Sequence, residues 1–410
     1  MQQRVTTPVK WRQHLTLDLP APAPGAIWVH ACSVGEVGSV APLIEALLAR
    51  GHAVHLSVVT ATGFAHARRL LGERITLAFL PWDLPFAMHR MIRRLQPALL
   101  LLAETEFWPG MLAACHRQQI PIIGINTRIS DRSFPRYRAS RWLWQRWLAP
   151  VALFLAQSDI DAERLAAMGV AAQKIRAVGN LKYALTPPQL DAAALRRQLD
   201  ASSQRPILLI ASTHEGEDRQ LLDMWPAWHA LCPELLTLIV PRHPERFERV
   251  AELIRERGLR LARWSAGDGH PGEQHAEVIL IDAMGVLTRL YTIADIVIIA
   301  GSLEQGGEKV GGHNPLEAAI CGRGVLTGPF VQNFRDIMQQ MQRAEAAIVC
   351  HNNGELERAV SELIRHPERL QQLHAHAACF MQERAAVLPR ILDAITPWLP
   401  QPHARTERDH

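Results

Sequence analysis

One candidate for proton transfer is Glu36, which follows the apolar run Ile27–Ala31 and opens a helical pattern. Its small neighbours Ser33 and Gly35 leave space, and a glycine there lets a substrate approach the backbone. A helix N-terminus also stabilises an ionised carboxylate. Glu36 could therefore be a general base for a hydroxyl group, or only a partner of the helix dipole.

Two further glutamates, Glu104 and Glu106, follow the apolar run 98–103 and precede a proline that starts a helix. The carboxyl end of a buried strand is the usual place for chemistry in α/β proteins. We expect one glutamate to pair with a cation such as Arg128 and the other to face a substrate, and the sequence leaves the assignment open. Lys182, in the stretch GNLK, either stabilises a developing negative charge there or is an ordinary solvated lysine.

In the second half of the chain, hydroxyl, imidazole and guanidinium groups follow apolar runs. These are Ser212, Thr213 and His214 after the run 207–211, and Arg242 and His243 after the run 236–240. Because arginine binds phosphate in a bidentate manner, the second group could clamp a phosphate. The alternative is a solvent-facing cluster at a helix start.

The most distinctive local pattern is GGHNPLE at residues 311–317, where two glycines precede a helix that starts at a proline. The free N–H groups of such a start suit a phosphate, and Glu317 could accept hydrogen bonds from ribose hydroxyls. Neither the Walker nor the dinucleotide-binding fingerprint fits the sequence. We therefore expect a nucleotide in the second half of the chain.

The segments that carry these residues alternate between apolar runs and amphipathic stretches, which is typical of parallel strands joined by helices. The predicted class is α/β, with two doubly wound, Rossmann-like domains facing across a cleft, where such folds bind ligands. We predict an N-terminal extension 1–25, a first domain 26–185, a linker 186–205, a second domain 206–395 that includes the final helices, and a polar tail 396–410. Strands are expected at 27–31, 53–59, 75–81, 98–103, 121–125, 153–157 and 175–178, and at 207–211, 236–240, 278–281, 296–300, 325–326 and 348–350.

Composition excludes several classes of protein. The chain has 410 residues, of which 48% are hydrophobic and 20% charged, as in a folded protein. Its six cysteines form no C-x-x-C pair, which argues against a disulfide frame or a metal site and favours a reducing, cytoplasmic compartment. No apolar run is long enough to span a membrane, and residues 1–25 lack the core of a signal peptide. We expect no nucleic-acid partner.

These blocks, in this order, resemble the 3-deoxy-D-manno-oct-2-ulosonic acid (Kdo) transferases of lipopolysaccharide assembly. The matching stretches lie between about Ile27 and Phe334 and include SVGE, ETEFWP, NTRIS, GNLK, STHEGE, PRHPERF and GGHNPLE. Each stretch is weakly specific, whereas the ordered set is highly specific. The resemblance implies a GT-B fold and an inverting, metal-independent glycosyltransferase without a cofactor, which moves Kdo from CMP-Kdo to a lipid A precursor.

The resemblance also implies roles for single residues. Glu36 would be the general base that takes the proton of the acceptor hydroxyl, and Glu104 and Lys182 would stabilise the transition state. The residues that would bind CMP are Arg242, His243, Met284, Gly285, Val286, Asn314, Pro315, Leu316 and Glu317. Supporting candidates are Ser33, Gly35, Arg128, Ser212, Thr213 and His214.

The sequence departs from the family in three places. The family commonly has an N-terminal hydrophobic anchor and residues 1–25 offer none, so we expect peripheral attachment to the cytoplasmic face of the inner membrane. The segment 136–148 combines arginines with Trp142, Trp144 and Trp147, as an interfacial helix does, unless these tryptophans are buried in the core. The loop 304–310 is longer than expected, and Val286 stands where the family usually has glutamate.

Two other functions remain open. Another GT-B enzyme, such as a UDP-sugar transferase or a UDP-sugar 2-epimerase, would share the two-sheet plan and would prefer UDP to CMP. A catalytically inactive paralogue would bind membrane or acceptor without transferring a sugar, although the presence of Glu36, Lys182 and Arg242 speaks against it.

Overall fold

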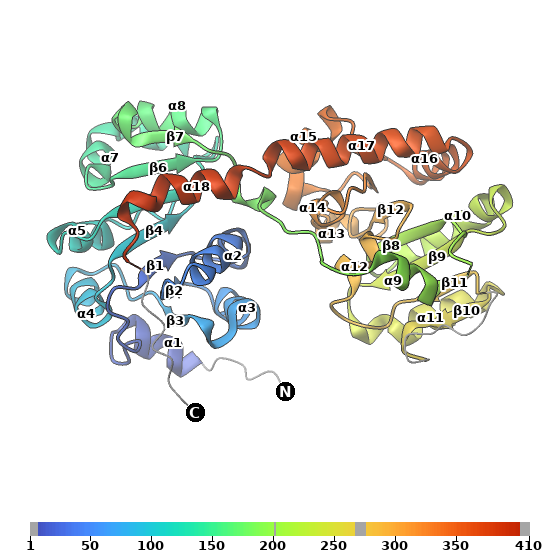
Figure 1. Ribbon diagram of the computed structural model, residues 1–410, viewed down its shortest axis with the longest axis horizontal. Coiled ribbons are helices and arrows are strands. Elements are labelled where there is room, and N and C mark those ends of the chain that lie inside the picture. Colours follow the sequence, from blue (N-terminus) through green and yellow to red (C-terminus); the bar gives the residue numbers. More distant parts are fainter. Residues whose placement is uncertain (1–6, 201, 267–275, 402–410) are drawn as a thin grey trace. The chain divides into compact units, whose positions relative to one another are not determined.

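Two parallel sheets of seven strands each organise the chain (Figure 1). The computed structural model describes residues 7–200, 202–266 and 276–401. Unit 1 comprises residues 1–184 and 384–410, and unit 2 comprises residues 185–383. The predicted α/β class with two doubly wound sheets is confirmed.

In unit 1 the strand order is β3-β2-β1-β4-β5-β6-β7. The strands are β1 (Ile27–His30), β2 (Val54–Val58), β3 (Thr76–Phe79), β4 (Leu99–Ala103), β5 (Ile122–Thr127), β6 (Leu153–Ala156) and β7 (Ile175–Ala177). The helices are α1 (Thr7–His14), α2 (Val34–Ala49), α3 (Ala61–Leu71), α4 (Pro85–Leu95), α5 (Pro109–Arg117), α6 (Phe134–Ala139), α7 (Arg141–Leu148), α8 (Asp159–Ala167) and α18 (Val387–Ile395).

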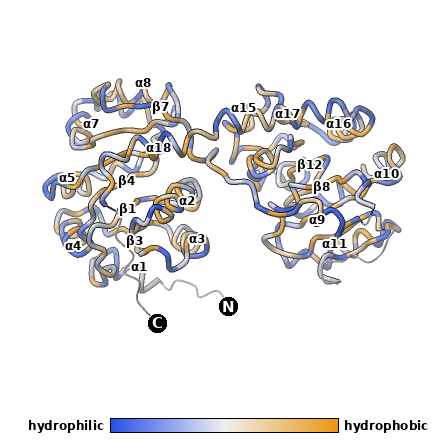
Figure 2. The backbone as a smooth tube through the Cα atoms, in the orientation of Figure 1, coloured by the Kyte–Doolittle hydropathy of each residue, from blue (hydrophilic) through white to orange (hydrophobic). Residues whose placement is uncertain are grey.

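Helices cover both faces of this sheet, so the central strands β1 and β4 are buried along their whole length and are mostly apolar (Figure 2). Because side chains alternate along a strand, Ile27 and Val29 enter one hydrophobic cluster while Trp28 enters the other. The chain winds away from β1 in one direction through β2 and β3, and in the other through β4. The neighbours β1 and β4 therefore form a topological switch point, where ligands bind in open α/β sheets.

Unit 2 repeats this plan with the order β10-β11-β9-β8-β12-β13-β14 and a switch point between β8 and β12. The strands are β8 (Ile207–Thr213), β9 (Leu236–Pro241), β10 (Leu261–Arg263), β11 (Val278–Leu280), β12 (Ile296–Ile299), β13 (Val325–Thr327) and β14 (Ala347–Val349). The helices are α9 (Ala192–Leu199), α10 (Glu217–Leu231), α11 (Phe247–Glu256), α12 (Leu287–Tyr291), α13 (Gly307–Val310), α14 (Leu316–Ala319), α15 (Arg335–Arg343), α16 (Asn353–Arg365) and α17 (Pro367–Arg384).

All thirteen predicted strands overlap a strand of the structure, and β10 was missed. Its three residues contain one buried side chain, Ala262, which is too little to form an apolar run. The loop 304–310, which is longer than expected for the family, contains the short helix α13.

The division of the chain differs from the expected boundaries in two places. In the expected linker, α9 buries Leu195 and Leu199, and Arg196 donates to the carbonyl oxygen of Ile293 and the carboxylate of Asp295, so this segment belongs to unit 2. At the other end, α18 belongs to unit 1, because Val387 and Ile391 pack in a hydrophobic cluster of that unit.

The N-terminal segment also packs on unit 1. In α1, His14 Nδ1 lies 2.6 Å from the carbonyl oxygen of Leu80, and Gln13 accepts the backbone N–H of Phe79. Residues 12–18 and 79–82 are therefore held side by side. The start of the expected polar tail 396–410 is instead packed, because Trp398 and Leu399 contact the hydrophobic cluster of unit 1. Residues from 402 onward lie outside the described part of the chain.

Replacement of Ile391 by alanine should destabilise unit 1 selectively. The change leaves a cavity in its core, and such cavities cost about 2–5 kcal/mol. Hydrogen exchange resolved by peptide should show lost protection in β1 and β4 and unchanged protection in β8 and β9. The matched variant Asp393→Ala changes an exposed side chain of the same helix and should preserve both. Lost protection confined to unit 2 would contradict the assignment of α18.

Candidate functional site

The carboxylate of Glu36 is held in place by the start of α2, at the end of β1. Ser33 is the N-cap of this helix, and its side-chain oxygen accepts the N–H of Glu36. In return, Glu36 accepts the backbone N–H of Cys32 at 2.8 Å and the hydroxyl of Ser33 at 2.9 Å. This arrangement is a variant of the capping box and fixes the carboxylate direction. A Cβ on Gly35 would meet no described atom within 4 Å, so the helix start is open beside Glu36.

The surroundings of Glu36 favour the protonated form. Burial raises the pKa of Glu36, the Cys32 N–H opposes this shift, and the negative charges of Glu106 and Glu104 add to it. The net effect is a pKa above the ordinary glutamate value. A carboxylate with raised proton affinity, at a switch point, suits a general base.

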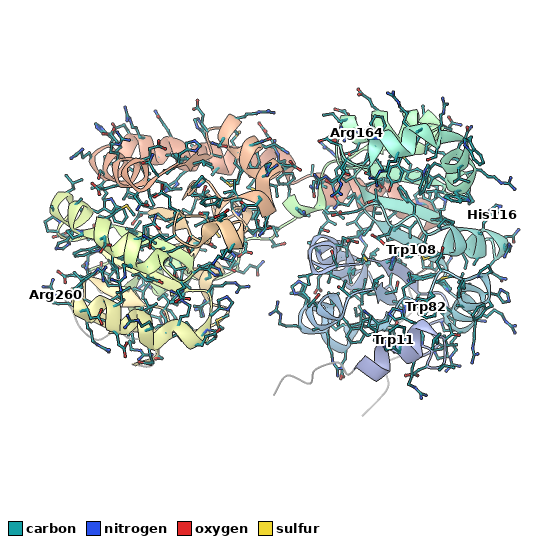
Figure 3. All side chains as sticks on the ribbon, turned by 180° about the vertical axis from the view of Figure 1, so that it is seen from behind. Trp11, Trp82, Trp108, His116, Arg164 and Arg260 are labelled. Carbon is teal, nitrogen blue, oxygen red and sulfur yellow. The ribbon has the colours of Figure 1, made fainter. Side chains whose placement is uncertain are left out.

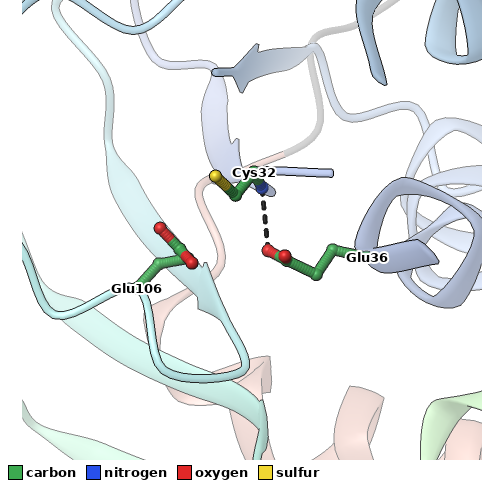
Figure 4. Close-up of side chains that lie close together, drawn as sticks. All are labelled: Cys32, Glu36 and Glu106. Carbon is green, nitrogen blue, oxygen red and sulfur yellow. Dashed lines mark hydrogen bonds between the residues drawn. The ribbon is translucent and has the colours of Figure 1, made fainter. Parts of the chain in front are cut away.

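Glu106 lies close to Cys32 and Glu36 (Figure 4), and its own contacts are structural. Its Oε2 accepts the indole N–H of Trp108 at 2.7 Å and lies 3.6 Å from Nε2 of the buried His30. Burial by itself would raise the pKa of Glu106, but the contacts with His30 and Trp108 outweigh it, and the net pKa is lowered.

The carboxyl group of Glu104 lies near two cations, Lys182 and Arg128. It ends β4 in a left-handed conformation, with φ of +49°, which is uncommon for a residue other than glycine. Burial raises its pKa, and the positive charges of Lys182 and Arg128 oppose the shift. Glu104 therefore lies near two cations, whereas Glu106 contacts His30 and Trp108. Which of the two glutamates faces a substrate stays a prediction.

Asn126 positions the segment that carries Lys182, a role that the sequence analysis missed. Asn126 is fully buried and left-handed, with φ of +50°, and its Oδ1 accepts the N–H of Leu181 at 2.9 Å. Asn180 Oδ1 then accepts the N–H of Lys182. An asparagine at the end of an apolar run was the available signal, because asparagine tolerates this conformation better than most residues.

Three side chains in this region could meet a metal ion. The ligand atoms of Cys32, Glu36 and Glu106 lie within 4.8 Å of one another, and no other such group occurs among the described residues. Burial, with the charges of Glu106 and Glu36, raises the pKa of Cys32 to about 12. Because a metal binds the thiolate, this thiol is a poor ligand. That the reaction needs no metal remains a prediction.

In unit 2, the buried carboxylate of Glu217 joins the ends of β8 and β12. It accepts the backbone N–H groups of Gly301, Ser302 and Leu303 at 2.7–3.0 Å, and that of His214 at 2.8 Å. This second missed residue lies in the STHEGE stretch. A carboxylate at the first position of α10 was the available signal, but helix dipoles attract such residues often.

Loop residues around this junction are locally constrained. Ser212 has φ of +62°, and the register between β8 and β9 shifts between Ala211 and Thr213. Thr213 donates to Asp218, which also pairs with Arg246. The supporting candidates Ser212 and Thr213 therefore shape the strand end.

The predicted CMP-binding residues Arg242, His243, Asn314 and Glu317 lie around this junction. The rings of His214 and His313 are nearly parallel with centroids 5.1 Å apart, and that of His243 meets His214 edge-on. Burial raises the pKa of Glu317, while Asn314 and the positive charge of Arg242 oppose the shift.

The remaining predicted residues adjoin this group. Pro315 and Leu316 start α14, which contacts α12. Val286 is the N-cap of α12, after Met284, which is 54% exposed, and Gly285.

Comparisons with known proteins place this chain among sequence relatives that share a description. A family model described as 3-deoxy-D-manno-octulosonic-acid transferase matches residues 7–185. The 3-deoxy-D-manno-octulosonic acid transferase of Haemophilus influenzae is 36% identical over 92% of this chain and 88% of its own length. That of Bordetella pertussis is 36% identical over 93% of this chain and 89% of its own length.

A solved structure supports the fold. The UDP-GlcNAc 2-epimerase of Neisseria meningitidis, bound to UDP-GlcNAc, superposes with a TM-score of 0.57 over 91% of this chain and all of its own, at 13% identity. This likeness shows the GT-B fold and nothing about the substrate. Since these two transferases are 36% identical to this chain and match over nearly all of it, the chain belongs to the 3-deoxy-D-manno-octulosonic acid transferase family of glycosyltransferases.

Proposed function

We propose that this protein transfers Kdo from CMP-Kdo to a hydroxyl group of a lipid A precursor, with inversion at the anomeric carbon. The observation that carries the proposal is the capped, partly buried carboxylate of Glu36, whose pKa is raised, at the switch point of unit 1. The identity of the transferred sugar is inferred from the family to which the chain belongs.

Glu36 would take the proton of the acceptor hydroxyl group. At the same time the oxygen of that hydroxyl group attacks the anomeric carbon of Kdo, and the bond from this carbon to the phosphate oxygen of CMP breaks. Direct displacement needs no covalent intermediate. Glu104 follows β4 and Lys182 lies in the turn after β7, and the positive charge of Lys182 acts on the carboxyl group of Glu104. They would stabilise positive charge at the anomeric carbon and negative charge on the anionic groups of the donor.

Unit 2 would bind the nucleotide. Arg242 offers a guanidinium to the phosphate. In the segment 314–317, Pro315 has no N–H and Asn314 Oδ1 accepts that of Leu316, so fewer backbone donors are free there than the sequence predicted. Glu317, with its raised pKa, would accept hydrogen bonds from the ribose hydroxyls. A valine at position 286 can contribute backbone and apolar contacts to the donor, without a side-chain carboxylate.

For the peripheral membrane contact, the structure favours a surface other than the one expected. On α7, Trp142 is 74% exposed, but Trp144 packs against Phe107 and Tyr137. No helix among the described residues could cross a bilayer.

Exposed apolar side chains gather instead around α1 and the start of α4, and we call this region the Trp11 surface. Its members are Trp11, Leu15, Leu17, Trp82, Leu84 and Phe86. The rings of Trp11 and Trp82 are 5.8 Å apart (Figure 3). On α4, Arg90 and Arg93 follow Phe86 at helical spacing, and His89, Arg90, Arg93 and Arg94 line a hollow with Leu19. Exposed aromatic rings beside cations suit a bilayer of anionic lipids.

Replacement of Glu36 by glutamine should lower transfer by at least about 100-fold, because the amide cannot accept the proton. CMP binding, measured by calorimetry, should be unchanged. The matched variant Glu45→Gln alters an exposed glutamate of the same helix and should retain activity. Unchanged turnover in the Glu36 variant would remove this residue from the mechanism, and a preference of the wild-type protein for UDP over CMP would overturn the donor.

The rate should fall on acidification at a higher pH than for an ordinary glutamate. Glu36 must be ionised to act as a base, and its pKa is raised. The variant Glu106→Gln removes one of the negative charges that raise this pKa, so its acidic limb should move to lower pH. The measurement is kcat/KM across the acidic range, with Glu45→Gln as the control whose limb stays in place. If the acidic limb of the kcat/KM profile did not move in Glu106→Gln, the limb would not report the ionisation of Glu36.

The combined variant Trp11→Ser, Trp82→Ser and Phe86→Ser should float poorly with vesicles that contain phosphatidylglycerol. The substitutions remove the exposed rings that would enter the headgroup region. Circular dichroism checks that the variant is folded, and Trp142→Ser is the matched control. If only the control loses binding, α7 and not the Trp11 surface faces the membrane.

A further inference from the structure

A pair of histidines at the β8–β12 junction has no role in the function proposed so far. The Nε2 atoms of His214 and His313 lie 2.9 Å apart, and their rings are within 14° of parallel. The pair is built into the fold, because Glu217 fixes the backbone of His214 and the segment 301–303. A Cβ on Gly301 would lie 2.7 Å from the ring of His313, so only glycine leaves room for that ring.

The geometry determines how many protons the pair holds. One of the two facing nitrogens must donate and the other accept, so a neutral pair shares one N–H between them. Each ring then has its Nδ1 left over, one with a proton and one with a lone pair. Among the described residues, neither Nδ1 has a hydrogen-bond partner. The pair can therefore take up one further proton without breaking its internal hydrogen bond.

The charged groups around the pair explain why it is neutral without a ligand. His243, Arg242 and Arg246 approach from the end of β9, Glu217 from α10, and Glu317 faces Arg242 from α14. Burial and the neighbouring positive charges lower the pKa of both His214 and His313 to about 4. A phosphate bound among these cations would offset their charge, so the balance would shift towards the protonated pair.

We propose that the His214–His313 pair is a phosphate-binding element that takes up one proton when a nucleotide phosphate binds. This rests on the proposed function, in which unit 2 holds the CMP moiety of the donor. The two Nδ1 atoms lie on the far sides of the facing rings, so one ring can give its N–H to the phosphate while the added positive charge is shared by the pair. When the sugar leaves, the phosphate of CMP gains negative charge. The added proton on the histidine pair stabilises this charge until CMP dissociates.

The test is calorimetric titration of the full chain with CMP in two buffers of different ionisation enthalpy. At about pH 7.5 the phosphate of CMP is a dianion, because phosphate monoesters have a second pKa of about 6. Proton uptake at this pH then belongs to the protein. We expect uptake of up to one proton per CMP. In His214→Gln and His313→Gln the uptake should vanish and the affinity should fall by about tenfold, the worth of one charge-assisted hydrogen bond.

The matched control is His376→Gln, which alters a partly exposed histidine of α17 in the same unit. It should keep both affinity and uptake. CMP binding without proton uptake in the wild-type protein would overturn the inference but would leave CMP as the proposed nucleotide. This titration of the wild-type protein needs no variant. Uptake retained in both glutamine variants would overturn it as well. If the wild-type protein bound no CMP at all, the proposed donor and the pair's role would both fall.

Discussion

The candidate sites depend on one kind of interaction, a carboxylate near the start of a helix that accepts backbone N–H groups at a strand end. In unit 2, Glu217 binds four such groups and thereby joins two strands that are far apart in sequence. In unit 1, Glu36 binds the N–H of Cys32 and the hydroxyl of Ser33. The two differ in burial, since Glu217 is fully covered whereas Glu36 is only partly so. The same local device therefore leaves Glu36 available for chemistry and Glu217 as a support.

Backbone strain is found at the same places. Glu104, Asn126 and Ser212 each adopt a left-handed conformation at or beside the end of a strand. Such conformations cost about 1–3 kcal/mol each and persist only where surrounding contacts fix them. At Asn126 the contact is the hydrogen bond to Leu181, which links the strain to the placement of Lys182.

The alternation of apolar runs was enough to predict the class and nearly every strand, because a parallel strand buried on both faces is apolar along its length. It could not assign α18 to a unit. Both sheets offer an apolar face to a terminal helix, and the choice depends on contacts such as Val387 with Gly179, which are distant in sequence. For the same reason the pattern could not separate Glu104 from Glu106. That choice depends on His30 and Trp108, and on Lys182.

Glu36 combines two roles, because it takes part in capping α2 and is also the proposed general base. Its two hydrogen bonds favour the ionised form and hold the carboxylate in one direction, which a flexible surface glutamate would lack. Those bonds alone would make it a weak base, since they lower proton affinity. Burial and the charges of Glu106 and Glu104 reverse this effect. Glu106 can supply that charge because its own contacts with His30 and Trp108 keep it ionised. The structural glutamate thus sets the proton affinity of the proposed catalytic one.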